Sequence, residues 1–319
     1  MPRALWITAP GMAELRDQTV TEAPGEVVVE TRWGAISRGT EALVFRGAVP
    51  ASERERMRAP FQDGDFPAPV KYGYSAVGRV ASETGPLSGR HVFVLHPHQT
   101  VFAVPAAAAL AIPDEVPPAR AVLAANMETA LNVVWDAGAG PGDNAAVVGA
   151  GVVGALAGWL LARMPGADVT LVDTNPAREA VAAALGCRFA SPDAAPANCD
   201  VVIHASADPA GLATALKAAG DEATVVEASW YGDRRVPVAL GGAFHSRRLR
   251  LVSSQVGQVP ADRRARWSRT RRLDTALALL AAPELDVLIS GETDFADLPA
   301  RYGAILDDPA TLCHRVRYR

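Results

Sequence analysis

The chain of 319 residues has few cysteines, no long apolar run and no strong excess of either charge. Cys187, Cys199 and Cys313 are odd in number and lack the spacing of metal ligands, so we expect reduced thiols in a cytoplasmic protein. No stretch approaches the roughly 18 uninterrupted apolar residues of a membrane span, and the N-terminal apolar run is too short for a signal peptide. The net charge of −4 gives no reason to expect a polyanion. These absences argue against nucleic-acid and membrane partners.

The length allows two domains with separate cores, and the sequence pattern changes along the chain. Residues 1 to about 115 contain short strand-like segments separated by turns, which are typical of a β-barrel-like domain; these segments are 26–31, 76–80, 89–95 and 100–105. A helical pattern follows at 117–137.

From about residue 144, predicted strands alternate with predicted helices. The strands are 144–149, 168–173, 187–190, 199–205, 222–228 and 249–254, and the helices are 152–163, 176–186 and 209–219. This alternation predicts a parallel sheet covered on both faces. A further helix is expected over 262–282, and a closing strand over 314–318.

A glycine motif, G-x-G-x-x-G, follows the first of these strands. Gly149 allows a tight turn, Gly151 lets the backbone approach a pyrophosphate, and Gly154 lets the next helix pack against the strand. Val152 and Val153 lie at the start of that helix, whose N–H groups face the phosphates. These features predict a dinucleotide-binding site.

Asp173 ends the next strand, nineteen residues after the third glycine, and can accept hydrogen bonds from the ribose hydroxyls of the adenosine half. A 2′-phosphate beside this carboxylate would be repelled by roughly 1 to 4 kcal/mol per charge pair. Thr174 and Asn175 follow, without an arginine. The sequence therefore favours NAD(H) over NADP(H), although Arg178, one helical turn on, can still pair with a phosphate.

Three more blocks accompany the glycine motif: 34–41, 73–80 and 141–143. Over nearly its whole length, the chain resembles the medium-chain dehydrogenase/reductase superfamily, and the first block is similar to the branch that contains bacteriochlorophyllide a dehydrogenase. The resemblance implies an α/β fold with a Rossmann doubly wound parallel sheet and a GroES-like β-rich catalytic domain. We expect the catalytic domain at 1–120, the NAD-binding domain at 121–258, a C-terminal segment at 259–319 that returns to the catalytic domain, and a homodimer.

The zinc ligands of the superfamily are replaced in this chain. Zinc members carry a cysteine where Ser37 or Arg38 stands, Gly-His-Glu where this chain has Gly-Tyr74-Ser75, and a third ligand near Ala125. These residues offer no thiolate, imidazole or carboxylate for a tetrahedral site. Three cysteines also cannot supply a four-cysteine structural zinc lobe. We therefore expect no zinc.

His96 and His98 are the remaining metal candidates. On a strand, side chains two residues apart point to opposite faces, so these two would bind one ion awkwardly unless Pro97 bends the chain. The simpler interpretation places one histidine in the interdomain cleft and the other at the surface.

Without zinc, a hydroxyl or an imidazole must polarise or protonate the carbonyl oxygen of a substrate. Tyr74 occupies the position of the family's histidine ligand, and Ser37 and Thr40 lie on the facing loop, so these three are the candidate catalytic residues. The alternative is that Tyr74 is a packed core tyrosine.

The candidate substrate pocket comprises Arg38, His98, Trp230 and Tyr231. Trp230 and Tyr231 follow the fifth Rossmann strand, where the superfamily has its nicotinamide-facing loop, and an aromatic pair there suits a bulky or planar substrate.

Further candidate cofactor residues follow the later strands. Ser254 and Gln255 end the sixth Rossmann strand, and the resemblance assigns that edge to the nicotinamide carboxamide. Ser206 and His204 end the fourth strand, where open α/β sheets bind ligands, so either can touch a ribose or simply be a surface-loop residue.

Two charged features have mainly structural interpretations. Glu41 matches an acidic position of the family, which implies that it anchors its loop to a basic residue. Residues 263–272 contain six arginines, which we interpret as a solvated helix start with paired carboxylates rather than a nucleic-acid site; one of them can also reach an anionic group of the cofactor or substrate.

The sequence thus favours a zinc-independent, NAD(H)-linked oxidoreductase acting on a small-molecule alcohol/ketone pair. Two alternatives remain: an NADPH-type quinone or enoyl reductase of the same superfamily, and an NAD(H)-binding sensor without turnover.

Overall fold

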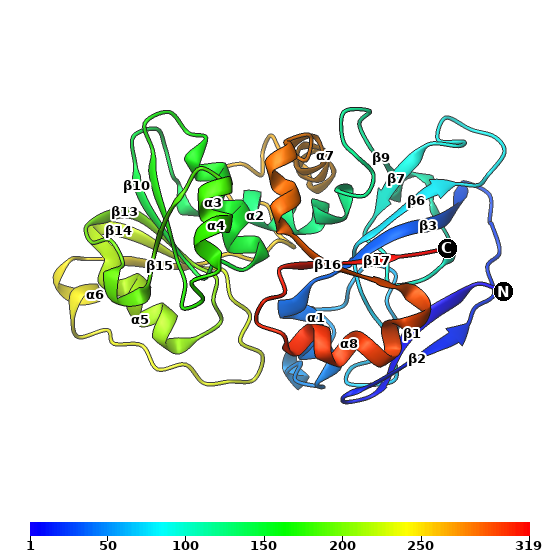
Figure 1. Cartoon of the computed structure of the whole chain (residues 1–319), viewed down its shortest axis with the longest axis horizontal. Helices are drawn as coiled ribbons and strands as arrows, with labels where there is room; N and C mark the ends of the chain where they lie inside the picture. Colours follow the sequence, from blue (N-terminus) through cyan, green and yellow to red (C-terminus); the bar gives the residue numbers. More distant parts are fainter. The chain divides into compact units, whose positions relative to one another are not determined.

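A computed structural model describes residues 1–319, which form two units (Figure 1). Unit 1 joins residues 1–125 to residues 277–319, and unit 2 comprises residues 126–276. Unit 1 is therefore built from both ends of the chain, and unit 2 is one continuous segment.

Unit 1 is rich in short strands. Its strands are β1 (Arg3–Ala9), β2 (Met12–Asp17), β3 (Glu26–Ile36), β4 (Asp63–Gly64), β5 (Val70–Lys71), β6 (Ala76–Val80), β7 (His91–Val94), β8 (Val101–Pro105), β9 (Leu110–Ala111), β16 (Ile289–Asp294) and β17 (Cys313–Arg317). Its helices are α1 (Arg38–Phe45) and α8 (Leu298–Asp307), with 3₁₀ turns at Ala51–Glu53, Ala106–Ala108, Ala121–Leu123, Pro283–Leu288 and Phe295–Asp297.

The strands of unit 1 form two sheets. One has the order β2-β1-β5-β4, and the other has the order β16-β17-β3-β6-β7-β9, with β8 also paired to β3. Strand β17, near the C-terminus, pairs antiparallel with β3, so the red and blue strands lie side by side in Figure 1. Val27 and Val29 alternate along β3, and Phe102 and Val104 alternate along β8. These side chains point into one apolar interior, which is why the segments form a β-rich core.

Unit 2 alternates strands and helices. Its strands are β10 (Asn144–Val148), β11 (Asp168–Val172), β12 (Arg188–Ala190), β13 (Cys199–His204), β14 (Ala219–Glu227) and β15 (Arg250–Ser253). The helices are α3 (Val152–Ala162), α4 (Arg178–Ala184), α5 (Pro209–Ala218) and α6 (Ala243–Ser246), with a 3₁₀ turn at Pro192–Ala194; α2 (Ala124–Ala137) and α7 (Arg269–Leu279) run across the unit boundaries.

The six strands of unit 2 are all parallel and have the order β12-β11-β10-β13-β14-β15. From β10, the chain adds β11 and β12 on one side. It then crosses back and adds β13, β14 and β15 on the other side of β10. Ligands of such sheets bind at the carboxyl ends of the strands beside this reversal. The predicted Rossmann sheet and the predicted α/β class are therefore confirmed.

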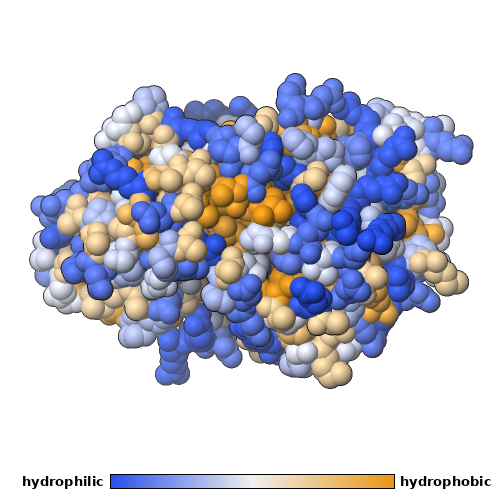
Figure 2. Space-filling model, in the orientation of Figure 1, coloured by the Kyte–Doolittle hydropathy of each residue, from blue (hydrophilic) through white to orange (hydrophobic).

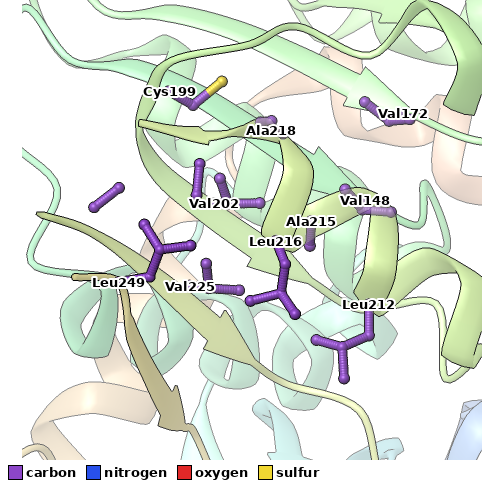
Figure 3. Packing of buried hydrophobic residues seen from close by; sticks show 13 residues of the cluster. Val148, Val172, Cys199, Val202, Leu212, Ala215, Leu216, Ala218, Val225 and Leu249 are labelled. Atoms are coloured by element: carbon purple, nitrogen blue, oxygen red, sulfur yellow. The ribbon is translucent and has the colours of Figure 1, made fainter. Parts of the chain in front are cut away.

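Aliphatic residues hold α5 against the sheet of unit 2. Leu212, Ala215 and Leu216 of the helix contact Val202 and Val225 of the strands, and every one of these side chains is buried (Figure 3). Burying one such valine or leucine contributes about 1.5–3 kcal/mol. This packing fixes the strand ends that carry the candidate cofactor residues.

The boundaries of the units differ from the expected domains. Residues 259–276 belong to unit 2 instead of the returning segment, because Val259 packs against Trp135 and Arg272 pairs with Glu128. The returning segment begins at Leu277, and the β-rich unit extends to residue 125.

Hydrophilic residues cover most of the face of the molecule drawn in Figure 2. None of the helices combines the length and the apolar character needed to cross a membrane.

Candidate cofactor site and candidate catalytic cluster

The glycine turn between β10 and α3 has the geometry that the motif predicts. Gly149 has φ +103°, a conformation that side chains rarely adopt, and a Cβ there would stand 2.5 Å from the backbone nitrogen of Ser206. A Cβ on Gly154 would stand 1.9 Å from the carbonyl oxygen of Gly149. Gly151 is the N-cap of α3, and a Cβ there would meet no protein atom within 4 Å. The missing side chains of Gly149 and Gly154 therefore allow the backbone to pack closely, whereas Gly151 leaves space in front of α3. Val152 and Val153 are the first two residues of that helix.

Asp173 lies directly after β11 and is half-buried. One carboxylate oxygen accepts the Ala150 N–H at 2.7 Å, and the other accepts the Asn175 N–H at 2.8 Å. The carboxylate thus ties the end of β11 to the glycine turn, a role that the sequence did not suggest. A carboxylate has about four acceptor sites, so capacity for ribose hydroxyls is left.

The two residues after Asp173 that bear on a 2′-phosphate differ in exposure. Thr174 is exposed, whereas Arg178, the first residue of α4, is only 7% exposed. The burial of Arg178 makes it a poor partner for a phosphate of a bound cofactor.

A hydrogen-bonded cluster joins the carboxyl ends of β13 and β14. His204 Nδ1 lies 2.8 Å from a carboxylate oxygen of Glu227, and its Nε2 lies 2.6 Å from the Ser206 hydroxyl. The Tyr231 hydroxyl donates to the same Glu227 oxygen at 3.2 Å. Burial pushes the pKa of Glu227 up, but hydrogen bonds from His204 and Ser229 outweigh it and leave that pKa below its usual value.

Sequence reasoning missed Glu227. Its position at the end of β14, on the ligand-binding edge of the sheet, could have identified it as a candidate site residue. The sequence allows His204 or Ser206 to touch a ribose or to be a surface-loop residue. His204 is fully buried, and Ser206 is exposed. Tyr231, expected in the substrate pocket, has its hydroxyl engaged with Glu227, and Trp230 beside it is half-buried.

Ser254 and Gln255 follow β15. The Ser254 hydroxyl donates to Asp136 at 2.6 Å and accepts from Asn132 at 3.3 Å, so this side chain joins the strand end to α2. The side-chain oxygen of Gln255 accepts the Gly257 N–H at 2.7 Å. These side chains hold the loop, which fits the expectation that this edge offers mainly backbone groups to a ligand.

In unit 1, the three candidate catalytic residues lie together. The hydroxyl of Tyr74 is hydrogen-bonded to the side chains of Ser37 and Thr40. Ser37 is the N-cap of α1, and its backbone N–H donates to Glu41 at 2.7 Å. Burial, with a smaller contribution from the charge of Glu41, raises the pKa of Tyr74 to about 12. Tyr74 is therefore a neutral phenol that can donate a proton, and it is a poor base at neutral pH.

Glu41 lies at the centre of this cluster and is fully buried. Its second oxygen lies 2.9 Å from His98 Nε2 and accepts the hydroxyl of Tyr302, while His98 Nδ1 lies 3.4 Å from the Tyr318 hydroxyl. The basic residue that Glu41 contacts is His98, and its other partners are the Tyr302 phenol and the backbone N–H of Ser37. Tyr302 and Tyr318 come from the returning segment, and no sequence motif marks them.

The expected surface histidine is not found, since His96 and His98 are 4% and 2% exposed. His96 stacks on Phe102 with the ring centroids 3.7 Å apart, and burial lowers its pKa to about 3, so it is neutral. His98, which was predicted to line the substrate pocket, is thus buried in the protein. No three histidine, cysteine or acidic side chains gather as a metal-binding group.

Several arginines that were expected in a pocket or in solvent instead make contacts that stabilise the fold. Arg38 donates to the Leu306 carbonyl at 3.0 Å. Arg272, from the arginine-rich segment, is 1% exposed and pairs with Glu128 at 3.0 Å. Other arginines of that segment stack on tryptophans: Arg263 on Trp135 and Arg271 on Trp267.

Comparison with known proteins agrees with this architecture. The family model of ketopantoate reductase (PanE/ApbA) matches residues 145–226, which lie within unit 2. A sequence relative is 2-desacetyl-2-hydroxyethyl bacteriochlorophyllide A dehydrogenase of Rhodobacter capsulatus, which is 28% identical over 95% of this chain and 92% of its own length.

Two solved structures cover the chain almost completely. L-idonate 5-dehydrogenase from Escherichia coli has a TM-score of 0.80 at 14% identity and covers 99% of this chain and 98% of its own. A putative zinc-binding dehydrogenase from Sinorhizobium meliloti, solved with NADP, has a TM-score of 0.78 at 18% identity and covers 99% of each chain. These likenesses establish the two-domain fold, with its Rossmann and GroES-like parts. The chain therefore has the fold that the resemblance to the medium-chain dehydrogenase/reductase superfamily implied.

Proposed function

We propose that this protein is a zinc-independent, NAD(H)-linked oxidoreductase that interconverts an alcohol and a ketone. The observation that carries the proposal is the glycine turn of unit 2. A Cβ on Gly151 would meet empty space in front of α3, although a Cβ on Gly149 or Gly154 would collide with backbone. A helix N-terminus with free space before it suits a pyrophosphate, because its N–H groups point at the anion.

The preference for NAD(H) rests on charge. Asp173 places a carboxylate at the edge of the glycine turn, and the nearby cation, Arg178, is buried. A 2′-phosphate next to Asp173 would meet a like charge without a mobile guanidinium to neutralise it.

The donor chemistry of unit 1 supports zinc independence. The resemblance implies that Ser37 or Arg38, Tyr74, Ser75 and Ala125 stand at the positions of the family's ligands. The Tyr74 hydroxyl is engaged with Ser37 and Thr40, and the Ser75 hydroxyl donates to the Val122 carbonyl at 2.7 Å. A neutral phenol and neutral serine hydroxyls do not form the set of charged and imidazole ligands that holds zinc.

In this proposal, the bound nicotinamide supplies or accepts the hydride, and residues of the chain handle the proton. Tyr74 donates its phenolic proton to the carbonyl oxygen during ketone reduction, since its raised pKa keeps it protonated. Ser37 and Thr40 orient the phenol and stabilise it after the proton has left.

The substrate is proposed to be a secondary alcohol and its ketone on a bulky or planar group. The aromatic pair Trp230 and Tyr231, half-buried after β14, supports this proposal. The R. capsulatus relative is named for a hydroxyethyl-bearing bacteriochlorophyllide, which is such a molecule.

A homodimer is proposed from the edge of the unit 2 sheet. Strand β15 ends the strand order, and its Leu251 is 36% exposed, so its outer edge is open to pairing with a second copy. Sedimentation equilibrium is expected to give twice the mass of the chain, and a monomer at micromolar concentration would contradict this.

Deuteride transfer tests the proposed function. The protein, freed of metal and kept in chelator, is mixed with NADH deuterated at C4 and with ketones that carry an acetyl group on a planar ring. We expect one deuterium on the carbinol carbon of the product, and slower transfer in Gly151→Ala when NADH is not saturating. Activity that appears only after zinc is added would refute zinc independence. Transfer to an activated alkene from NADPH alone would favour the quinone or enoyl reductase alternative.

A further inference from the structure

A cavity in the returning segment of unit 1 has no part in the proposed chemistry. It lies where α8 joins β16 to β17, and its volume is about 240 Å³ (Figure 1). Gly291 of β16 and His314 of β17 border it, together with Arg301 of α8 and Asp308, which caps the end of that helix. At about 30 Å³ for each water-sized atom, the cavity has room for roughly eight non-hydrogen atoms of a ligand.

One wall of the cavity is an imidazole ring with an unused nitrogen. His314 is 8% exposed, and its Nε2 lies 2.8 Å from the Thr293 hydroxyl. Its Nδ1 has no hydrogen-bond partner in the protein and is not sealed from solvent. A Cβ on Gly291 would stand 2.7 Å from this nitrogen. The glycine therefore leaves Nδ1 open to a ligand in the cavity.

Two opposite charges border the cavity without pairing with each other. Arg301 and Asp308 are both exposed, and neither takes part in an ion pair. Burial, followed by the charge of Arg301, lowers the pKa of His314, so the ring is neutral at neutral pH. The charges of Glu292 and Asp308 act on that pKa in the opposite direction. Because Glu292 is already paired with Arg315, the charges left for a ligand are those of Arg301 and Asp308.

A ligand with a single charge would suit this pair of groups poorly. A simple anion at Arg301 would be repelled by Asp308, and a simple cation at Asp308 would be repelled by Arg301. A ligand that carries a carboxylate at one end and an ammonium group at the other satisfies both. The guanidinium binds the carboxylate through two parallel N–H donors, and the Asp308 carboxylate accepts from the ammonium group.

The separation of the two charges sets the length of the ligand. Arg301 and Asp308 lie seven residues apart, which is about 10 Å along the axis of α8. The long arginine side chain closes only part of this gap, and an α-amino acid holds its two charged groups next to each other. We propose that the cavity binds a short zwitterion of the ω-amino acid class, with its carboxylate at Arg301, its ammonium group at Asp308 and one polar group at His314 Nδ1.

Three probes of similar size test the need for both charges. The unmodified protein is titrated with 4-aminobutyrate, butyrate and butylammonium, and binding is followed by ligand-observed NMR. We expect 4-aminobutyrate to bind at least about 10-fold more tightly than either of the other two, because each of those lacks one charge-assisted hydrogen bond. Equally tight binding of butyrate or butylammonium would overturn the zwitterion assignment, and a failure of 4-aminobutyrate to bind would overturn the site.

Variants of the two charged residues should each abolish one preference. Asp308→Asn should remove the preference for 4-aminobutyrate over butyrate, and it keeps an oxygen for the Ala310 N–H, which Asp308 accepts at 2.8 Å. Arg301→Ala should remove the preference over butylammonium, because the carboxylate then has no cationic partner. Gly291→Ala, whose methyl group would crowd the free imidazole nitrogen, should weaken the binding of all three probes. Arg56→Ala, which removes an exposed guanidinium that does not border the cavity, is the control and should leave both preferences unchanged.

Thermal unfolding of each variant without ligand separates a folding defect from a binding defect. Asp308→Asn and Arg301→Ala change exposed positions and are expected to keep the stability of the unmodified protein. If both variants retain both preferences, the zwitterion does not lie between these residues, and the inference is overturned. The cavity belongs to unit 1 and the glycine turn to unit 2, so these titrations need no cofactor. A negative result would leave the proposed function intact, and a failure to bind NADH would leave this inference intact.

Discussion

Alanine substitution of two glycines in the same motif is expected to affect two different properties. Gly154→Ala should lower the stability of the fold, and Gly151→Ala should lower the affinity for NADH. In Gly154→Ala, the new methyl group would stand 1.9 Å from the Gly149 carbonyl oxygen, a backbone atom that cannot rotate away. Overpacking of this kind costs about 1–3 kcal/mol. At about 2–4 °C per kcal/mol for a domain of this size, the melting temperature should fall by roughly 2–12 °C.

In Gly151→Ala, the new methyl group meets no protein atom within 4 Å, and φ is −69°. The loss of chain entropy in the unfolded state stabilises the variant by about 0.4–1 kcal/mol, and the poorer N-cap offsets this by a similar amount, so stability should barely change. The methyl group does occupy the space in front of α3. Breaking one charge-assisted hydrogen bond to the pyrophosphate costs about 1.5–3 kcal/mol, or roughly 10- to 150-fold in NADH affinity.

The assay is a pair of measurements on each variant: melting temperature by circular dichroism and NADH dissociation constant by fluorescence titration. Gly151→Ala should lose affinity and keep its stability, and Gly154→Ala should lose stability. If Gly151→Ala binds NADH as tightly as the unmodified protein, the pyrophosphate does not lie against this turn, and the reasoning from the motif fails.

Four further outcomes are expected. Tyr74→Phe should lower ketone reduction about 10²- to 10⁴-fold with NADH affinity unchanged, and full turnover would make Tyr74 a packing residue. Because the pKa of Tyr74 is raised to about 12 and the neutral phenol is the active form, its ionisation should not reduce the rate below about pH 10; a loss between pH 7 and 9 that Tyr74→Phe abolishes would contradict this. Arg272→Ala leaves Glu128 buried without its cation and should destabilise the fold by about 3–5 kcal/mol in urea unfolding, against under about 0.5 kcal/mol for the exposed Arg266→Ala; equal effects would refute a structural role for the pair. Elemental analysis of chelator-treated protein should find well under one zinc per chain, and a stoichiometric zinc on which activity depends would contradict the ligand argument.

Local sequence patterns predicted the fold of unit 2, because each of its strands and helices has a recognisable pattern of apolar residues and glycines. The expected strand over 144–149 is β10 (Asn144–Val148), and the expected helix over 152–163 is α3 (Val152–Ala162). Glycine positions are equally local, since a turn of positive φ and a close helix approach each need a residue without a side chain. The same reasoning placed the closing strand near residue 314, where β17 lies.

Contacts between distant segments were beyond this reasoning. The pairing of His204 with Glu227 depends on the register of β13 against β14, and Glu41 meets Tyr302 only because α8 packs beside α1. The burial of His96 could not be foreseen from its spacing to His98, because it depends on the stacking with Phe102. Side-chain partners follow from register and packing, which a single sequence does not specify.

The most direct test of NAD(H)-linked function is a titration of the unmodified protein with NADH and NADPH under identical salt. The carboxylate of Asp173 should make NADH the tighter ligand by roughly 1 to 4 kcal/mol, or about 5- to 10³-fold. Asp173→Asn, which removes the charge and keeps one acceptor oxygen for the turn, should narrow that gap. Tighter binding of NADPH to the unmodified protein, or no binding of either cofactor, would contradict the account.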